Sequence, residues 1–268
     1  MPHESCPGYG AEPFRTLADD YPGEDAYPRD GFRTEWGPVF HRGRLDGTAR
    51  LLVIGQDPAA HEAIARRILV GEAGQRVQGL LARLGLDRSY VFVNAFLYSV
   101  YGQRSESHVA DEGITAYRNR WLDAIAATSP VQGVITLGRA AERALRLWPG
   151  GAALRRVAAL HPTYPDAASR AGVVTLEEGM RRLCASWNAA LDVLAPAVTP
   201  DRAVPLRPYG NRLEPGDLAR IPAADLPAGT PPWMRDLEGW AARTGATAGQ
   251  KRATITVTVP PSAAWWLA

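Results

Sequence analysis

Side chains capable of chemistry occur at four places in the sequence, each directly after a short apolar run. They supply a carboxylate, a carboxamide, an arginine and an imidazole, in the segments Gly55-Gln56-Asp57-Pro58, Asn94, Gly138-Arg139 and His161-Pro162-Thr163-Tyr164. A carboxylate and an imidazole together can activate a water molecule and stabilise a leaving group, which is general acid–base chemistry. A carboxamide offers both a donor and an acceptor, so it can read the hydrogen-bonding edge of a planar ligand.

Each of these residues also has an ordinary structural interpretation. Asp57 and Asn94 could simply cap turns, and His161-Pro162 could be only a chain reversal. Their shared position after apolar runs favours a site instead. Ligands of parallel α/β sheets bind beyond the carboxyl ends of the strands, which is where all four segments would lie.

The apolar runs predict the strands that position these residues. Short, continuous apolar segments are typical of buried parallel strands, and they occur at 51–54, 90–93, 131–137 and 157–160. Segments with helical spacing follow them, at 72–84, 111–127, 139–148 and 176–194, the last opened by a Thr175/Glu178 capping box and ended by Pro196. This alternation predicts an α/β fold: a three-layer α/β/α sandwich around a central, mostly parallel four-stranded sheet.

Composition divides the chain into three parts. Residues 1–48 are rich in proline, glycine and charge, with scattered aromatics, and predict an N-terminal arm packed on the core. Residues 49–195 contain the four polar segments and form the predicted core domain. Residues 196–268 predict a C-terminal extension packed on that core, with a short helix at 233–243 and a strand at 254–259.

The overall composition is that of an ordinary soluble globular protein, with 46% hydrophobic and 22% charged residues. No apolar run approaches the roughly 20 residues that cross a bilayer, and residues 1–10 lack the features of an export signal. We therefore expect a cytoplasmic monomer without membrane contact. The net charge of +2 is too small to indicate a nucleic-acid partner, so any such surface must be a local patch. The two cysteines, Cys6 and Cys184, indicate free thiols and cannot hold an iron–sulfur cluster.

Several segments resemble motifs of the uracil-DNA glycosylase superfamily. Gly55-Gln56-Asp57-Pro58 resembles the water-activating motif of its first family, and residues 161–165 (His-Pro-Thr-Tyr-Pro) resemble the second motif, His-Pro-Ser-Pro-Leu. Residues 70–75 (Val-Gly-Glu-Ala-Gly-Gln) resemble a stretch of the iron–sulfur-containing branch, and 131–145 resemble the strand–helix unit before its histidine motif. The resemblance covers roughly residues 49–195, with the motifs in the right order and spacing.

The resemblance implies a monofunctional DNA glycosylase of base excision repair that uses no cofactor and no metal. The target base would leave the duplex, because its glycosidic bond is inaccessible inside the stack. Asp57 would orient or deprotonate the attacking water, Asn94 would read the uracil edge, and His161 would donate a hydrogen bond to O2 of the departing base.

The resemblance also implies which residues contact the substrate. The expected base-binding residues are Gly55, Gln56, Pro58, Ala59, Leu69 and Asn94. The expected DNA contacts are Pro162, Thr163, Tyr164, Pro165, Arg139 and the loop 102–107.

The sequence departs from the family patterns around the base. The first family follows its Asp-Pro with Tyr-His, where the tyrosine excludes the thymine methyl; this chain has Ala59-Ala60, with His61 one place later. We expect looser selectivity, which admits damaged bases other than uracil, and we expect His61 to be an exposed helix residue. Leu69 stands where the iron–sulfur branch has a phenylalanine that stacks on uracil.

Two further roles are therefore open. Phe96 or Tyr98 is a candidate for the missing stacking residue. The four cluster cysteines of the iron–sulfur branch are absent, so no cluster is expected. Pro165 replaces the leucine wedge of the second motif, and Tyr164 or Pro165 is the candidate to fill the gap left by the flipped base.

Three other functions fit part of the pattern. A uracil-DNA-trapping protein of the same superfamily would use a histidine after the asparagine strand. His108 lies in such a loop, but the Arg-Arg-Ile-His sequence of that branch is missing, and Asp57 favours turnover. A nucleoside or nucleotide hydrolase would use the same scaffold without a DNA strand. A nucleotide-binding module without chemistry would leave the placement of Asp57 and His161 at strand ends unexplained.

Overall fold

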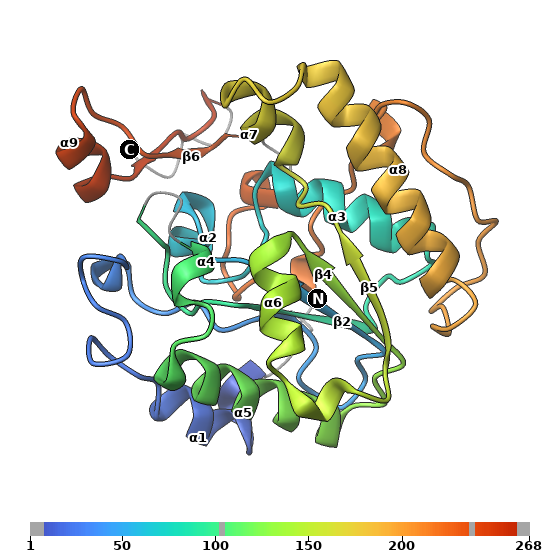
Figure 1. Ribbon diagram of the computed structural model, residues 1–268, viewed down its shortest axis with the longest axis horizontal. Helices are drawn as coiled ribbons and strands as arrows, with labels where there is room; N and C mark the ends of the chain where they lie inside the picture. The colour runs from blue at the N-terminus through green and yellow to red at the C-terminus, as the bar shows by residue number, and fades with distance from the viewer. Residues whose placement is uncertain (1–7, 102–104, 236–238, 262–268) are drawn as a thin grey trace.

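Parallel strands form where the apolar runs predict them in the computed structural model, which describes residues 8–101, 105–235 and 239–261. They are β2 (Leu51–Gly55), β3 (Tyr90–Asn94), β4 (Gly133–Leu137) and β5 (Arg155–Ala159). β2 and β4 are buried throughout, and β3 up to its last residue, as expected for strands with helices on both faces. All four run in the same direction, so their carboxyl ends share one edge of the sheet (Figure 1).

The sheet has five strands, in the order β1-β3-β2-β4-β5, and not the four that the sequence predicts. The added strand, β1 (Arg42–Gly43), comes from the N-terminal arm and pairs antiparallel with β3. A strand of two residues shows no apolar periodicity in the sequence, and an arginine in it would be expected at the protein surface. Arg42 is nevertheless fully buried, because its guanidinium bonds the side chains of Gln78 (2.9 Å) and Asp225 (3.1 Å).

Helices cover both faces of the sheet, which confirms the three-layer α/β/α sandwich (Figure 1). One face carries α5 (Glu112–Thr128), α6 (Arg139–Arg146) and α1 (Phe14–Asp19). The other carries α3 (Glu72–Arg83) and α8 (Leu176–Leu194). Alternate residues of each strand point to opposite faces, so Leu52 and Ile54 join the first layer whereas Leu51 and Val53 join the second.

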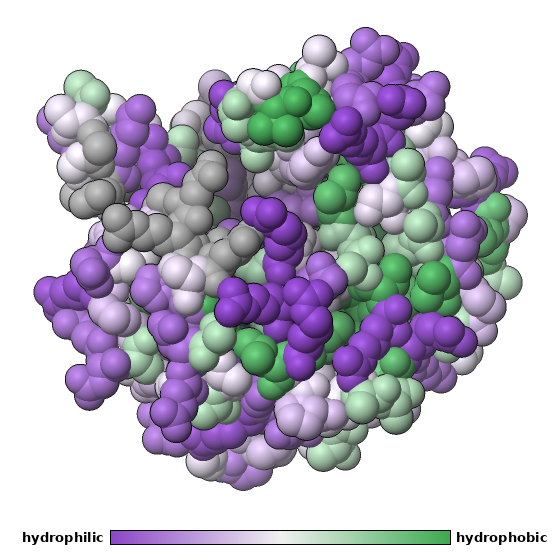
Figure 2. Space-filling model, viewed as in Figure 1, coloured by the Kyte–Doolittle hydropathy of each residue, from purple (hydrophilic) through white to green (hydrophobic). Residues whose placement is uncertain are grey.

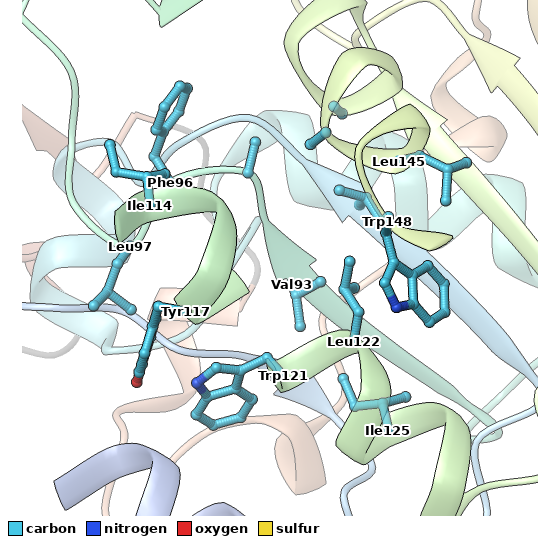
Figure 3. Close-up of a cluster of buried hydrophobic side chains, with 14 of the residues drawn as sticks. Val93, Phe96, Leu97, Ile114, Tyr117, Trp121, Leu122, Ile125, Leu145 and Trp148 are labelled. Carbon is cyan, nitrogen blue, oxygen red and sulfur yellow. The ribbon is translucent and has the colours of Figure 1, made fainter. Parts of the chain in front are cut away.

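The first layer is built around aromatic side chains. Trp121 and Tyr117 of α5 pack beside Val93, with Trp148 following α6 (Figure 3). Aromatic residues of the N-terminal arm complete the same cluster, among them Phe14, Tyr27 and Phe32.

The short elements differ most from the predictions. The helices α2 (Ala60–Ala65), α4 (Ser105–His108) and α7 (Tyr164–Arg170) are too short to show helical periodicity in the sequence. The N-cap of α8 forms as expected, since the Thr175 side chain accepts from the Glu178 backbone N–H at 3.1 Å. The Glu178 carboxylate bonds Arg181 and Arg182 and does not return to the cap.

The predicted helix at 233–243 is wrong. Pro232–Arg235 is a single 3-10 turn, and Ala241–Ala242 is a strand, β6, which pairs with β7 (Thr256–Val257) inside the predicted strand 254–259. Gly239 has a φ of 66°, which is incompatible with a continuous helix. Residues 236–238 lie outside the described part of the chain. The remaining helices are α9 (Ala248–Ala253) and the 3-10 turns Gly8–Gly10, Thr34–Trp36, Pro149–Gly151, Pro215–Asp217 and Ala223–Asp225.

The C-terminal extension packs against α2 through a third hydrophobic cluster. Ile221, Leu226, Trp233 and Trp240 are its large members, and they cover Ala60, Ala65 and Val70. Figure 1 shows β6 beside α2. The extension therefore lies next to the segment that follows Asp57. None of the helices in the described ranges combines the length and apolar character needed to span a bilayer.

Replacing Gly74 by alanine should destabilise the fold. Leu69 has a φ of 52°, and its carbonyl lies so close to α3 that a Cβ on Gly74 would stand 1.6 Å from the oxygen. Such overpacking typically costs about 1–3 kcal/mol. Urea denaturation of Gly74→Ala measures it. Gly210→Ala is the control: a Cβ there meets nothing within 4 Å, so its free energy of unfolding should stay within about 0.5 kcal/mol of the parent.

Candidate active site

The chain leaves β2 through a corner that holds Asp57 by both carboxylate oxygens. One oxygen accepts the Val100 backbone N–H at 2.9 Å, and the other accepts the Gln56 side-chain amide at 3.0 Å. The backbone carbonyl of Gln56 accepts the backbone N–H of Phe96 at 3.0 Å. Segments after β2 and β3 are thereby tied together, and the carboxylate has a defined direction.

The environment of Asp57 suits a base that works near neutral pH. Burial raises its pKa to about 6, although the hydrogen bonds from Val100 and Gln56 oppose the shift. The charge of Glu62 also raises this pKa, and the charge of Arg33 lowers it. A catalytic base is most effective when its pKa lies near the working pH. Asp57 is ionised above that pKa and still basic enough to take a proton from water.

Gly55 and Asn94 are paired at the ends of neighbouring strands. A Cβ on Gly55 would stand 2.3 Å from Oδ1 of Asn94, so only glycine leaves room for this amide. The Leu69 side chain approaches the same point, with its Cδ1 at 3.9 Å. Gly55, Leu69 and Asn94 therefore converge at one end of the sheet.

The amide nitrogen of Asn94 is buried and has no hydrogen-bond partner among the described residues. Leaving a buried polar group unsatisfied costs about 1–3 kcal/mol. Core groups such as Trp121 Nε1 and Thr136 Oγ1 share this state, so the position of Asn94 at the carboxyl end of β3 is what points to a ligand. A donor left open at the end of a strand is what a ligand-reading amide requires before its ligand arrives.

His161 follows β5 and is held as a neutral imidazole. Its Nδ1 accepts the Thr163 backbone N–H at 3.2 Å and lies 2.8 Å from the Thr163 hydroxyl oxygen. Because Nδ1 acts as an acceptor, the ring proton resides on Nε2, which is the donor of the neutral ring. Burial, together with the nearby charge of Arg76, lowers the pKa of His161 to about 4.

Arg76 of α3 holds the histidine loop, a role that the sequence interpretation missed. Its guanidinium donates to the Pro162 carbonyl at 2.7 Å and to Asp166 at 3.2 Å, and it also pairs with Glu72. The residue is buried, with 7% of its surface exposed. Its position directly after the Val-Gly-Glu-Ala-Gly-Gln stretch was the available signal.

The expected DNA-contact residues differ in accessibility. Pro162 is buried, and Pro165 is buried against Gly179 of α8, where a Cβ would stand 2.9 Å from the Pro165 Cα. Thr163 and Tyr164 are half-buried at the start of α7. Of the two wedge candidates, Tyr164 is therefore the more accessible.

Arg139 begins α6 directly after Gly138, whose φ is 90°. It is exposed, as are Arg143 and Arg146 on the same helix, and Figure 2 shows hydrophilic side chains gathered over α6. In the loop 102–107, residues 102–104 lie outside the described part of the chain, as does Cys6. Cys184 is a buried, free thiol in α8.

His61 is not the exposed residue that the sequence predicts. It is half-buried in α2, where its Nε2 accepts the Ala241 backbone N–H at 3.2 Å. Its ring forms a T-shaped contact with the Trp240 ring, with 4.8 Å between the ring centroids. The C-terminal extension covers it, and that packing could not be read from the local sequence. His108 pairs with Asp111 at 2.8 Å.

The two candidates for a base-stacking aromatic are both core residues. The ring centroid of Phe96 lies 5.5 Å from that of Phe32, and the ring centroid of Tyr98 lies 4.9 Å from that of Tyr27. Asn94 and Phe96 both line a small cavity, together with other aromatic and aliphatic side chains. Asp57 and His161 are not among its lining residues.

The three candidate side chains are held separately at one edge of the sheet. Asp57, Asn94 and His161 follow β2, β3 and β5, and β4 lies between β2 and β5. Gly138, which follows β4, lies next to His161, because a Cβ on Gly138 would stand 3.3 Å from the Cβ of His161. Ala59 is exposed beside Asp57, and Pro58 is buried.

The structure is an α/β sandwich that places a carboxylate, an amide with an unpartnered nitrogen and a neutral imidazole after the carboxyl ends of its parallel strands. The family model of the Uracil DNA glycosylase superfamily matches residues 42–180, just over half of the 268-residue chain. The chain therefore belongs to the uracil-DNA glycosylase superfamily. No curated protein matches it. Membership supports a function of the DNA glycosylase type, in a superfamily that also has non-enzymatic members.

Proposed function

We propose that this protein is a monofunctional DNA glycosylase that removes uracil from DNA. The observation that carries the proposal is the buried amide nitrogen of Asn94, which has no hydrogen-bond partner among the described residues and lies beside Gly55 and Leu69. A pyrimidine edge with one acceptor and one donor is the complement of such an amide. Family membership supplies the class of reaction, and the states of Asp57 and His161 are compatible with it.

In the proposed mechanism the uracil nucleotide leaves the duplex before chemistry begins. The Asn94 amide pairs with O4 and N3–H of the base, against the apolar side chain of Leu69. As the C1′–N1 bond breaks, its electron pair moves to the base and positive charge develops on the sugar. The Nε2–H of His161 donates to O2, where the negative charge gathers. The Asp57 carboxylate takes a proton from the water that bonds to C1′.

The proposed pocket is less selective than one closed by a tyrosine. Ala59 follows Pro58 where a bulky side chain would exclude substituents at C5 of the base, and it is exposed. We extend the proposal to other deaminated bases, which share the amide-like edge. The loop 161–165 and Arg139 are proposed to contact the DNA backbone, the latter at a helix N-terminus that favours phosphate.

A panel of oligonucleotides tests this proposal, each carrying uracil, hypoxanthine, xanthine or an etheno-base in single- or double-stranded form. Alkali-labile breaks at the uracil position are the expected result. A covalent adduct that survives denaturing electrophoresis would replace the proposal with a trapping function. Cleavage of free nucleosides without cleavage of oligonucleotides would replace it with nucleoside hydrolysis.

The rate of base release should rise as the pH is raised through about 6. Asp57 must be ionised to accept the proton, and burial raises its pKa to about 6. His161 should not contribute to this limb, because its pKa is lowered to about 4. Single-turnover rates measured across this range give the profile. A rate that stays constant from about pH 5 to about pH 8 would contradict Asp57 as the base.

A further inference from the structure

Glu62 is a buried carboxylate that joins two separate parts of the site. It lies in the first turn of α2, and only 6% of its surface is exposed. One carboxylate oxygen accepts the Ala59 backbone N–H at 3.0 Å, and the other accepts the Val70 backbone N–H at 3.1 Å. Among the ion pairs of the described residues, none includes Glu62.

The two N–H groups belong to segments that flank the proposed catalytic groups. Ala59 lies two residues after Asp57, at the end of the corner that follows β2. Val70 directly follows Leu69, whose φ of 52° is unfavourable for a branched side chain. The Leu69 side chain reaches the space beside Gly55 and Asn94. A single side chain therefore fixes both the water-activating corner and the wall beside the base-reading amide.

The geometry requires a carboxylate of this length. Both donors are backbone N–H groups, so both partner atoms must be acceptors. A glutamine offers one oxygen and one NH₂ group, and the latter would face an N–H. An aspartate keeps the charge but is one methylene shorter, so it cannot span the same two groups.

We propose that Glu62 is a positioning residue of this site, which holds the Asp57 corner and the Leu69 wall at a fixed separation. The proposal rests on the glycosylase function proposed above. It assigns Glu62 no contact with substrate; Glu62 acts through Asp57 and Leu69.

Glu62 also belongs to the charges that set the proton affinity of Asp57. From α2, Glu62 raises the pKa of Asp57; from the N-terminal arm, Arg33 lowers it; Gln56 and the Val100 N–H lower it by hydrogen bonding. Burial raises the pKa of Glu62 itself, and the charge of Arg42 lowers it. Position and charge can be separated experimentally, because aspartate keeps only the charge and glutamine keeps only the length.

The test compares Glu62→Gln, Glu62→Asp and the control Glu177→Gln, an exposed glutamate in the first turn of α8. Single-turnover release of uracil from an oligonucleotide is measured against pH, together with DNA affinity. Both Glu62 variants should lose about tenfold or more in rate, since small misplacements of catalytic groups are costly. DNA affinity should stay near that of the parent. The pH midpoint should fall in Glu62→Gln and stay at the parental value in Glu62→Asp. Glu177→Gln should match the parent throughout.

Parental rates and midpoints in both Glu62 variants would overturn the proposal. If the parent releases uracil and Asp57→Asn does not, parental behaviour of the Glu62 variants would overturn the role of Glu62 alone. A parent that releases no uracil would instead overturn the proposed function. Hydrogen exchange in the parent keeps the proposal testable should Glu62→Gln fail to fold. The Ala59 and Val70 amides should be protected at least about tenfold relative to exposed loop amides, and unprotected amides would overturn it.

Discussion

Asp57→Asn is expected to lower the rate of base release by about 10²–10⁴-fold, the usual contribution of a general base. Asparagine keeps the size of the side chain and can still accept the Val100 N–H, which lies 2.9 Å from Asp57. Its NH₂ group then faces the Gln56 side chain, whose amide, unlike a backbone N–H, can turn to present its oxygen. Asparagine cannot take a proton from water or offset positive charge on the sugar. DNA affinity should therefore stay near that of the parent. Single-turnover cleavage and equilibrium binding to the same uracil-containing oligonucleotide separate the two effects.

The same substitution should stabilise the folded protein at neutral pH. Because the pKa of Asp57 is raised on folding, its stabilising contribution is present below the unfolded pKa and is lost as the pH rises through about 6. At about pH 8 the ionised carboxylate then opposes folding by about 1–3 kcal/mol, discounted for its partial exposure. The advantage of Asp57→Asn in urea denaturation should shrink towards about pH 4. A variant that cleaves at nearly the parental rate would contradict the role of Asp57 as the base, and a variant that is less stable at both pH values would contradict its raised pKa.

His161→Leu is expected to lower the rate by about 10²–10³-fold, as does removal of an oxyanion donor. Leucine fills a similar space but cannot donate to O2 of the departing base. Thr163→Val is the matched control, because it removes the hydroxyl next to Nδ1 but keeps the backbone N–H that the ring accepts. Its loss in single-turnover rate should be much smaller.

The pH profile distinguishes the two candidate groups. His161→Leu should keep the midpoint near 6, because the pKa of His161 lies near 4 and that of Asp57 near 6. Loss of that limb in His161→Leu, with the limb intact in Asp57→Asn, would reverse the assignment of the two residues.

The sequence predicted the parts of the fold that carry long-range patterns. Continuous apolar runs located β2, β3, β4 and β5, and helical spacing located α3, α5, α6 and α8 to within a few residues. These patterns are visible because most of these elements bury a whole face or stripe, although β5, at the edge of the sheet, buries only Ala159. The positions of Asp57, Asn94 and His161 at the edge of the sheet follow from the strands alone.

The rest depends on tertiary contacts that leave no local pattern. β1 consists of two residues, and the buried Arg42 bonds Gln78 and Asp225, which lie far away in the sequence. His61 is covered because Trp240 and Ala241 return to α2. Glu62 and Arg76 resemble solvent-facing charges of amphipathic helices, yet each is buried on backbone groups of the site.

The structure of the Asp57→Asn variant bound to a uracil-containing duplex tests the central claim most directly. The account predicts an extruded uracil whose edge pairs with the Asn94 amide, with O2 in hydrogen-bond distance of His161 Nε2 and the sugar beside residue 57. A uracil that remains stacked in the duplex, or that occupies a cavity away from Asn94, would contradict the account.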